Sequence, residues 1–195
     1  MSRLANVSGA LLLGGASSRM GEDKARIVIG GVPLAARAAS LLSDLFEDVL
    51  LVGDTPPSGL PGREVADLPG PRCALRGLAT ALDAARSERV VVLATDMPFV
   101  DAALILALTA HADCDAVVPR TDDGVHPLCA IYRRDPLAKL AQERLAAGAL
   151  KLDGLLGAID THYLDGDDLR GLDPTGRALT NVNTLEELAR VRAAT

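Results

Sequence analysis

The sequence predicts one α/β domain over residues 1–195, built around a doubly wound, mostly parallel β-sheet that is flanked by helices. Three observations support this fold class. Short apolar runs recur along the chain, segments with helical patterning separate them, and the runs are apolar throughout instead of alternating with polar residues. Continuous apolar runs are typical of parallel strands that helices cover on both faces. A chain of this length is also a usual size for a single domain.

The first half of the chain supplies the regular part of this pattern. Strands are predicted over residues 10–13, 48–53, 89–96 and 115–120. Helices are predicted over residues 33–43, 75–86 and 102–111. Pro33 opens the first helix, where its missing N–H costs little. Residues 55–72 are rich in proline and glycine and are predicted to form a loop, whose length favours a functional role.

The second half is less regular. Residues 128–134 predict a strand and residues 136–147 an amphipathic helix, followed by a helix over 151–158 and a short strand over 160–164. Thr184 begins Thr-Leu-Glu-Glu, a capping box in which Glu187 reaches back to the N–H of Thr184. This motif predicts a final helix over residues 185–192.

Composition narrows the possible partners. Aromatic residues make up 2% of the chain, tryptophan is absent, and the formal net charge is −6. Base stacking needs aromatic platforms and a nucleic-acid surface needs a broad basic face, so nucleic acid is not an expected partner. No apolar run is long enough to span a bilayer, and we expect a cytoplasmic protein without membrane contact. Cys73, Cys114 and Cys129 form no CxxC pair and are expected to be small buried side chains, not zinc ligands or disulfides.

The residues after the first predicted strand carry the first functional signal. The strand ends at Leu13, and Gly14, Gly15, Arg19 and Lys24 follow it. Ligands of α/β sheets bind at the carboxyl ends of the strands, but this spacing fits neither a GxGxxG fingerprint nor a Walker A loop. Adjacent glycines let backbone N–H groups approach a phosphate closely, while the Arg and Lys side chains neutralise its charge. The segment is therefore predicted to bind phosphate, and the alternative is a flexible loop with two solvated cations.

Two further polar motifs lie near the same predicted edge of the sheet. Asp96 ends a buried run and precedes Pro98, and an aspartate there is well placed to hold Mg²⁺ through one oxygen. The alternative for Asp96 is to cap the following turn. Asn181 and Asn183 lie just before the final predicted helix, where they either cap the helix or contact a ligand or a metal-bound water.

Taken in order, these motifs resemble one known family. The segments are LGGASSRMGEDK (residues 13–24), DMPF (96–99), HPLCAIYRR (126–134) and NVNT (181–184). Together they resemble the molybdenum cofactor guanylyltransferase (MobA-type) family of the nucleotidyltransferase superfamily, across nearly the whole chain. The first motif is shared by the wider superfamily, whereas its combination with the aspartate–proline turn and NxNT is more specific.

The resemblance implies a Rossmann-like nucleotidyltransferase fold and a Mg²⁺-dependent reaction. GMP would pass from GTP to molybdopterin or Mo-molybdopterin, giving the guanine dinucleotide cofactor and pyrophosphate. It also implies exchange with molybdopterin-delivering and apo-molybdoenzyme proteins. The implied catalytic residues are Arg19, Lys24 and Asp96, with Asp96 as the metal ligand and Arg19 beside the departing pyrophosphate. The implied nucleotide-binding residues are Leu12, Leu13, Gly14, Gly15, Lys24, Asp54, Asp67 and Asp96, and Asn181 and Asn183 are implied near the pterin substrate.

Three departures from the family pattern keep other functions open. Leu13 stands where the family usually has Ala, residues 73–77 read Cys-Ala-Leu-Arg-Gly in place of Gly-Pro-Leu-Ala-Gly, and Asp54 stands where Asn is common. The Asp54 carboxylate accepts hydrogen bonds but donates none, although guanine N1–H and its 2-amino group both donate. The alternatives are a molybdopterin cytidylyltransferase, a sugar- or alcohol-phosphate nucleotidyltransferase, or an inactive nucleotide- or cofactor-binding partner protein.

Overall fold

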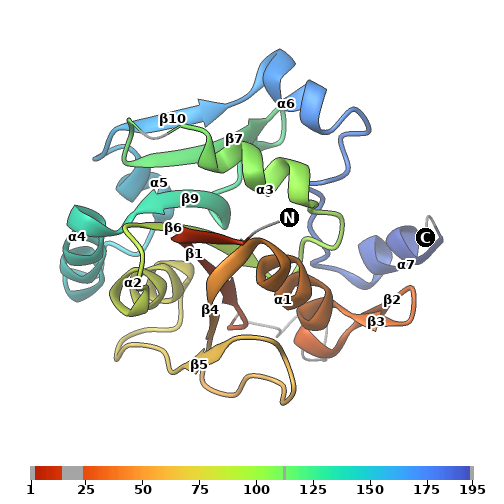
Figure 1. Cartoon of the computed structure of the whole chain (residues 1–195), viewed down its shortest axis with the longest axis horizontal. Coiled ribbons are helices and arrows are strands. Elements are labelled where there is room, and N and C mark those ends of the chain that lie inside the picture. The colour runs from red at the N-terminus through yellow and green to blue at the C-terminus, as the bar shows by residue number, and fades with distance from the viewer. Residues whose placement is uncertain (1–2, 15–23, 112, 194–195) are drawn as a thin grey trace.

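A central β-sheet organises the protein. The computed structural model describes residues 3–14, 24–111 and 113–193, and over these residues it contains a mixed eight-stranded sheet (Figure 1). The strand order is β10-β7-β9-β6-β1-β4-β5, with β8 paired to β7. The strands are β1 (Leu4–Leu12), β4 (Phe46–Val52), β5 (Arg63–Val65), β6 (Arg89–Ala94), β7 (Ala116–Thr121), β8 (Gly124–Val125), β9 (Cys129–Arg133) and β10 (Thr161–Leu164).

Parallel pairing dominates the middle of the sheet. Strand β1 is parallel to both β4 and β6, and its last residue, Leu12, lies opposite Val52 and Ala94. The carboxyl ends of three strands therefore meet at one edge. Strand β9 is antiparallel to β6 and β7, because residues 122–128 are too few for the crossover that a parallel connection from β7 would need. The structure confirms the predicted doubly wound, mostly parallel α/β class.

Helices cover both faces of this sheet (Figure 1). Alternate residues of β6 face two separate cores, Val91 and Leu93 on one side and Val90 and Val92 on the other. The first core also holds residues of α1 (Leu34–Leu45), α3 (Ala102–Thr109) and α6 (Gly166–Leu172). The second holds residues of α2 (Ala74–Ala84), α4 (Arg134–Ala146) and α5 (Leu152–Leu156). Burial on both faces is the physical reason why the strand sequences are apolar throughout.

The end of the described chain returns to its beginning. Helix α7 (Leu185–Ala193) lies beside the hairpin of β2 (Val28–Ile29) and β3 (Val32–Pro33), which follows the short 3₁₀ helix η2 (Lys24–Arg26) (Figure 1). Ile27, Ile29, Val182 and Leu188 belong to the small apolar cluster between them. The capping box is confirmed, since the N–H of Thr184 donates to Glu187 Oε2 at 3.0 Å and the N–H of Glu187 donates to Thr184 Oγ1 at 3.1 Å.

The structure differs from the sequence expectations at several connections. The segment 55–72 contains β5, which pairs with β4 in parallel, and neither the β2–β3 hairpin nor α6 was predicted. Helix α1 begins at Leu34, so that Pro33, with φ −60°, is the residue before the helix and not part of its first turn. Strands β2, β3 and β5 and helix α6 are two to seven residues long, too short for a hydrophobic period to reveal them.

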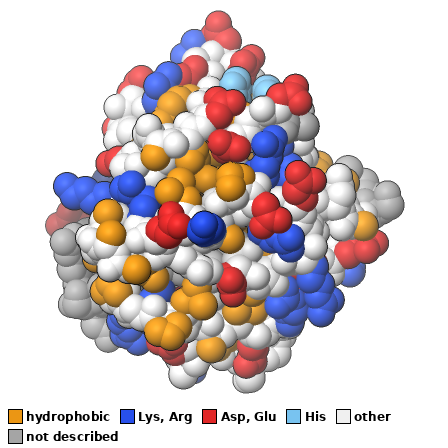
Figure 2. Space-filling model, turned by 90° about the vertical axis from the view of Figure 1, so that its left-hand side faces the viewer, with side chains coloured by type: hydrophobic (Ala, Val, Ile, Leu, Met, Phe, Trp, Pro, Cys, Tyr) orange, Lys and Arg blue, Asp and Glu red, His pale blue; other side chains and the backbone are white. Residues whose placement is uncertain are grey.

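The cysteines depart from expectation at one position. Cys114 and Cys129 are buried as predicted, and burial raises the pKa of Cys129 to about 12. Cys73 is only half-buried, because it precedes α2 at the rim of the sheet. Figure 2 shows the face that carries α2 and α4, on which acidic and basic side chains are interspersed with apolar ones. Within the described ranges, no helix combines the length and apolar character needed to cross a membrane.

Candidate active site

A cavity of about 550 Å³ lies where β1, β4 and β6 end. It lies at the carboxyl edge of the sheet, where α/β proteins bind their ligands. Of the predicted nucleotide-binding residues, those that line it are Leu12, Leu13, Gly14, Lys24, Asp54, Asp67 and Asp96. Gly15 and Arg19, which the sequence also assigns to this site, lie outside the described residues. The structure thus brings most of the predicted set into one cavity.

The floor of the cavity is fixed by hydrogen bonds at the end of β1. The N–H of Leu13 donates to the carbonyl of Val52 at 2.8 Å, and the buried Thr95 hydroxyl donates to the carbonyl of Leu12 at 2.8 Å. From α2, Gly77 lies so close that a Cβ atom there would be 3.2 Å from Cδ1 of Leu12. These contacts anchor the backbone just before the predicted phosphate-binding residues begin.

One end of the cavity carries an ion pair between distant segments. Nζ of Lys24 lies 3.0 Å from Oδ2 of Asp96, and it also donates to Oδ1 of Asn183 at 2.5 Å. Lys24 comes from η2 and Asp96 follows β6, so these contacts join three parts of the chain. A lysine ammonium has three donors, of which these two acceptors engage two. Since Lys24 lines the cavity, an anionic ligand can accept from the same group.

The segment before α7 reaches this end of the cavity through backbone contacts. The N–H of Val182 donates to the carbonyl of Asp96 at 2.8 Å. The Glu187 carboxylate also accepts from the N–H of Asn183 at 2.6 Å, and this bond lowers the pKa of Glu187 more than any other contact does. Of the two predicted asparagines, Asn183 contacts Lys24, whereas neither Asn181 nor Asn183 is among the described residues that line the cavity.

The other end of the cavity carries two carboxylates and two arginines. Nη2 of Arg76 lies 2.8 Å from Oδ2 of Asp67 and 3.8 Å from Oδ2 of Asp54, and Nη2 of Arg72 lies 3.5 Å from the same Asp54 atom. Asp67 and Arg76 are 5% and 13% exposed, while Asp54 is 49% exposed. Gly53 has φ +154°, a conformation that favours glycine, and directs the chain into Asp54. The two carboxylates and two guanidinium groups at this end of the cavity therefore offer hydrogen-bond acceptors and donors side by side.

Sequence reasoning did not assign Arg72, Arg76 and Thr95 to the site. In the sequence, Arg76 is the positive charge that residues 73–77 gain relative to the family segment Gly-Pro-Leu-Ala-Gly. Arg72 is the last residue of the predicted loop over residues 55–72. Their significance depends on β5, which brings Asp67 next to α2. The N–H of Leu68 donates to Thr80 Oγ1 at 3.0 Å and thereby holds the segment after β5 against that helix.

The side chains around Asp96 determine how a metal ion could be held at this end of the cavity. Within the described ranges, no group of three or more acidic, His or Cys side chains is arranged to hold a metal by itself. Asp96 instead presents one carboxylate at the cavity edge. Mg²⁺ is commonly bound by one or two carboxylates together with substrate phosphates and water. The described residues therefore fit a magnesium ion that is shared with a nucleotide, and they do not by themselves form a cage for a resident metal.

Comparison with known proteins agrees with this geometry. The chain folds like a nucleotidyltransferase: the crystal structure of molybdopterin-guanine dinucleotide biosynthesis protein A from Archaeoglobus fulgidus superposes with a TM-score of 0.84 at 25% identity, over 96% of this chain and 97% of that one. The MobA-like NTP transferase domain model matches residues 9–160. The protein therefore belongs to the MobA-like NTP transferase family.

Relatives of similar length carry a more particular name. A probable molybdenum cofactor guanylyltransferase from Chloroflexus aggregans is 36% identical over 96% of this chain and 94% of its own length. Another, from Pelotomaculum thermopropionicum, is 31% identical over 95% of this chain and 91% of its own length.

Proposed function

We propose that the protein transfers GMP from GTP to molybdopterin or its molybdenum-bearing form, giving the guanine dinucleotide cofactor and pyrophosphate. The observation that carries this proposal is the Lys24–Asp96–Asn183 cluster at the edge of a nucleotide-sized cavity, in a chain of the MobA-like family. The relatives named as guanylyltransferases match nearly the whole chain, which supports the same reaction. Exchange of substrate and product with molybdopterin-delivering and apo-molybdoenzyme proteins is part of the proposal.

The reaction needs alignment and charge neutralisation more than covalent chemistry. A phosphate oxygen of molybdopterin attacks the α-phosphorus of GTP, the bond between the α-phosphorus and the bridging oxygen breaks, and pyrophosphate leaves with the bonding electrons. Lys24 is assigned to the phosphates, where an ammonium group stabilises the charge that builds up on the oxygens. Arg19 is assigned to the departing pyrophosphate. Asn183 holds the Lys24 ammonium group in place.

Asp96 is proposed as the protein ligand of Mg²⁺. Bound there, the ion would neutralise charge on the phosphates. Lys24 keeps the same carboxylate oriented toward the cavity, and the Val182 N–H fixes the backbone at this residue. The backbone of residues 12–14, together with Asp54 and Asp67, is assigned to the rest of the nucleotide, and Asn181 to the pterin side.

The direct test is product formation with each nucleotide. Purified protein would be incubated with Mg²⁺, molybdopterin and either GTP, CTP or ATP, and pyrophosphate and the dinucleotide product would be measured. We expect product with GTP, and none in the presence of excess chelator. Product only with CTP would make the protein a cytidylyltransferase and overturn the proposal. Nucleotide binding without product would make it a binding protein of the same fold.

A further inference from the structure

The two ends of the cavity present different chemical groups. Strands β4 and β6 flank β1, so their carboxyl ends are about 10 Å apart, and β5 lies one strand further out. Lys24 and Asp96 mark the β6 end, to which the phosphates are assigned. Asp54 follows β4, and Arg72 and Arg76 lie beside it. If GTP binds as proposed above, its base therefore lies at the end that carries these two arginines.

Arg76 connects the two carboxylates at this end. Its guanidinium group pairs with Asp67 at 2.8 Å and lies 3.8 Å from Asp54. Because Asp67 is almost fully buried, this ion pair compensates its carboxylate for the contacts with water that burial removes. The same guanidinium group also donates toward the carbonyl of Gly70 at 3.4 Å, so it ties the segment after β5 to α2. Arg76 thus fixes the position of both acceptors without being exposed itself.

Arg72 is the exposed donor at the mouth of the cavity. Its side chain is 80% exposed, and its Nη2 atom lies 3.5 Å from Oδ2 of Asp54. The pair places a charged donor next to a charged acceptor. Guanine presents the matching pattern, since its N1–H and 2-amino groups donate while the neighbouring O6 accepts. Cytosine presents a single donor group, its amine, beside two acceptors, and adenine lacks an oxygen at position 6.

We propose that Arg72 and Arg76 determine the base specificity of this protein. Asp54 accepts from N1–H and the 2-amino group of guanine, Arg72 donates to O6, and Arg76 acts as a positioning residue that holds Asp54 and Asp67 in place. This inference rests on the proposed function and adds the residues that select the base. It also explains how the chain recognises guanine with an aspartate at a position where asparagine is common.

Inosine triphosphate separates the two roles, because it keeps O6 and N1–H but lacks the 2-amino group. Calorimetric titration would compare GTP, ITP and CTP, each with Mg²⁺. For the wild-type protein we expect GTP to bind about tenfold or more tightly than ITP, the size of one hydrogen bond to a charged group. The Arg72→Met variant should weaken GTP and ITP by the same factor, leaving their ratio unchanged. The Arg76→Met variant should bring that ratio close to one.

Two further variants keep the test decisive. If the Arg76→Met variant fails to fold because Asp67 loses its partner, a double variant is used in place of the single variant. This double variant, Asp67→Asn, Arg76→Met, also removes the buried carboxylate charge. Arg86→Met is the matched control, since Arg86 is 76% exposed and lies before β6, at the opposite edge of the sheet. Its affinities for GTP and ITP should equal those of the wild-type protein.

The outcomes distinguish this inference from the function on which it rests. Equal affinities of the wild-type protein for GTP and ITP, an unchanged ratio in the Arg76 variants, or an Arg72 effect confined to GTP would each overturn the assignment while leaving GMP transfer intact. Tighter binding of CTP than of GTP would overturn both proposals. Absence of binding by every nucleotide would remove the nucleotide site itself.

Discussion

Nζ of Lys24 and Oδ2 of Asp96 are 3.0 Å apart, although 72 positions separate the two residues. Both side chains are 20% exposed, so their charges interact in surroundings where water screens them only in part. The sheet creates this proximity, because Asp96 follows β6 and the residues before Lys24 follow β1, the neighbouring strand. The ion pair and the contact with Asn183 together orient the Lys24 ammonium group at the edge of the cavity.

Lys24 should be essential for turnover. The Lys24→Ala variant is expected to lose about 100- to 1,000-fold in kcat, as when a single donor to a charged transition state is removed. Pyrophosphate release under saturating GTP measures the loss. Lys139→Ala is the control, since that lysine is 84% exposed on α4 and pairs only with Glu143 among the described residues. A rate for Lys24→Ala equal to that of the control would remove Lys24 from the catalytic set.

Cys73 should report on occupancy of the cavity. It is half-buried and lines the cavity, whereas Cys114 and Cys129 are buried in the cores. A thiol reagent such as iodoacetamide is therefore expected to label Cys73 first, and saturating GTP with Mg²⁺ should slow that labelling. Mass spectrometry of peptides after timed exposure gives the rate at each cysteine. Equal labelling with and without GTP would show that the nucleotide binds elsewhere.

Asp48 should make stability depend on pH. Burial alone would raise the pKa of this carboxyl, but hydrogen bonds from Arg63, Ser8 and the N–H of Arg86 outweigh it and hold the pKa below the ordinary value of 3.8. A group whose pKa is lower in the folded state contributes its full stabilisation of the fold at pH values above its unfolded pKa. This contribution is lost as the pH falls through the folded-state pKa.

The variant Asp48→Asn tests this dependence. It should lower the free energy of unfolding at neutral pH by about 1–3 kcal/mol, the range for a hydrogen-bonded charge. The difference from the wild-type protein should shrink as the pH falls below 3.8, because the wild-type carboxyl then becomes neutral as well. Thermal melts followed by circular dichroism across this range measure it. A difference that stays constant with pH would contradict the assignment of the effect to this charge.

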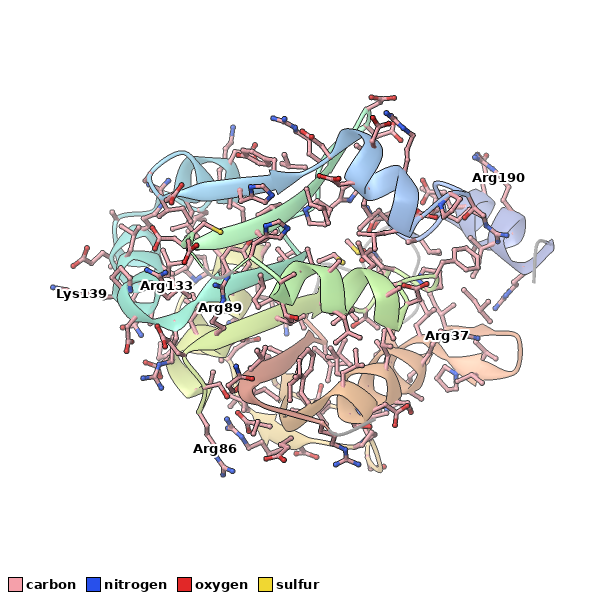
Figure 3. All side chains as sticks on the ribbon, turned by 45° about the horizontal axis from the view of Figure 1, so that its top comes forward. Arg37, Arg86, Arg89, Arg133, Lys139 and Arg190 are labelled. Atoms are coloured by element: carbon pink, nitrogen blue, oxygen red, sulfur yellow. The ribbon has the colours of Figure 1, made fainter. Side chains whose placement is uncertain are left out.

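The buried guanidinium group of Arg89 should lower the free energy of unfolding of the protein. Its three guanidinium nitrogens are buried and have no hydrogen-bond partner among the described residues. It also lies opposite Arg133 in the β6–β9 ladder, as Figure 3 shows. An unpaired buried charge is costly, and its replacement by an apolar side chain of similar length is often stabilising.

The variant Arg89→Met is therefore expected to raise the free energy of unfolding by about 1–3 kcal/mol. Urea denaturation would measure the change, with Arg86→Met as an exposed control expected within about 0.5 kcal/mol of the wild-type protein. A lower stability for Arg89→Met would mean that the guanidinium group has a stabilising partner.

Local sequence signals predicted the parts of this protein that local forces determine. The apolar run before Asp96 forms β6 because both of its faces are buried. Thr184 and Glu187 form the predicted cap because the motif is contained within four residues. Asp96 and Lys24 could be placed at the same edge of the sheet, since both follow strands that were visible as apolar runs.

The remaining features depend on tertiary contacts. Strand β5 is three residues long and forms because β4 offers it an edge to pair with. The contact of Asn183 with Lys24 requires the packing of α7 on the β2–β3 hairpin, which no periodicity reveals. Arg76 could be seen only as a departure from a motif, because its carboxylate partners follow two different strands.

The bond between Lys24 and Asn183 has a consequence for the timing of synthesis. These residues are 159 positions apart, and the matched domain ends at residue 160. During synthesis Lys24 and Asp96 are therefore made well before Asn183. A nascent chain that has not yet reached Asn183 would, among the described contacts, hold the Lys24 ammonium group through Asp96 and not through the asparagine.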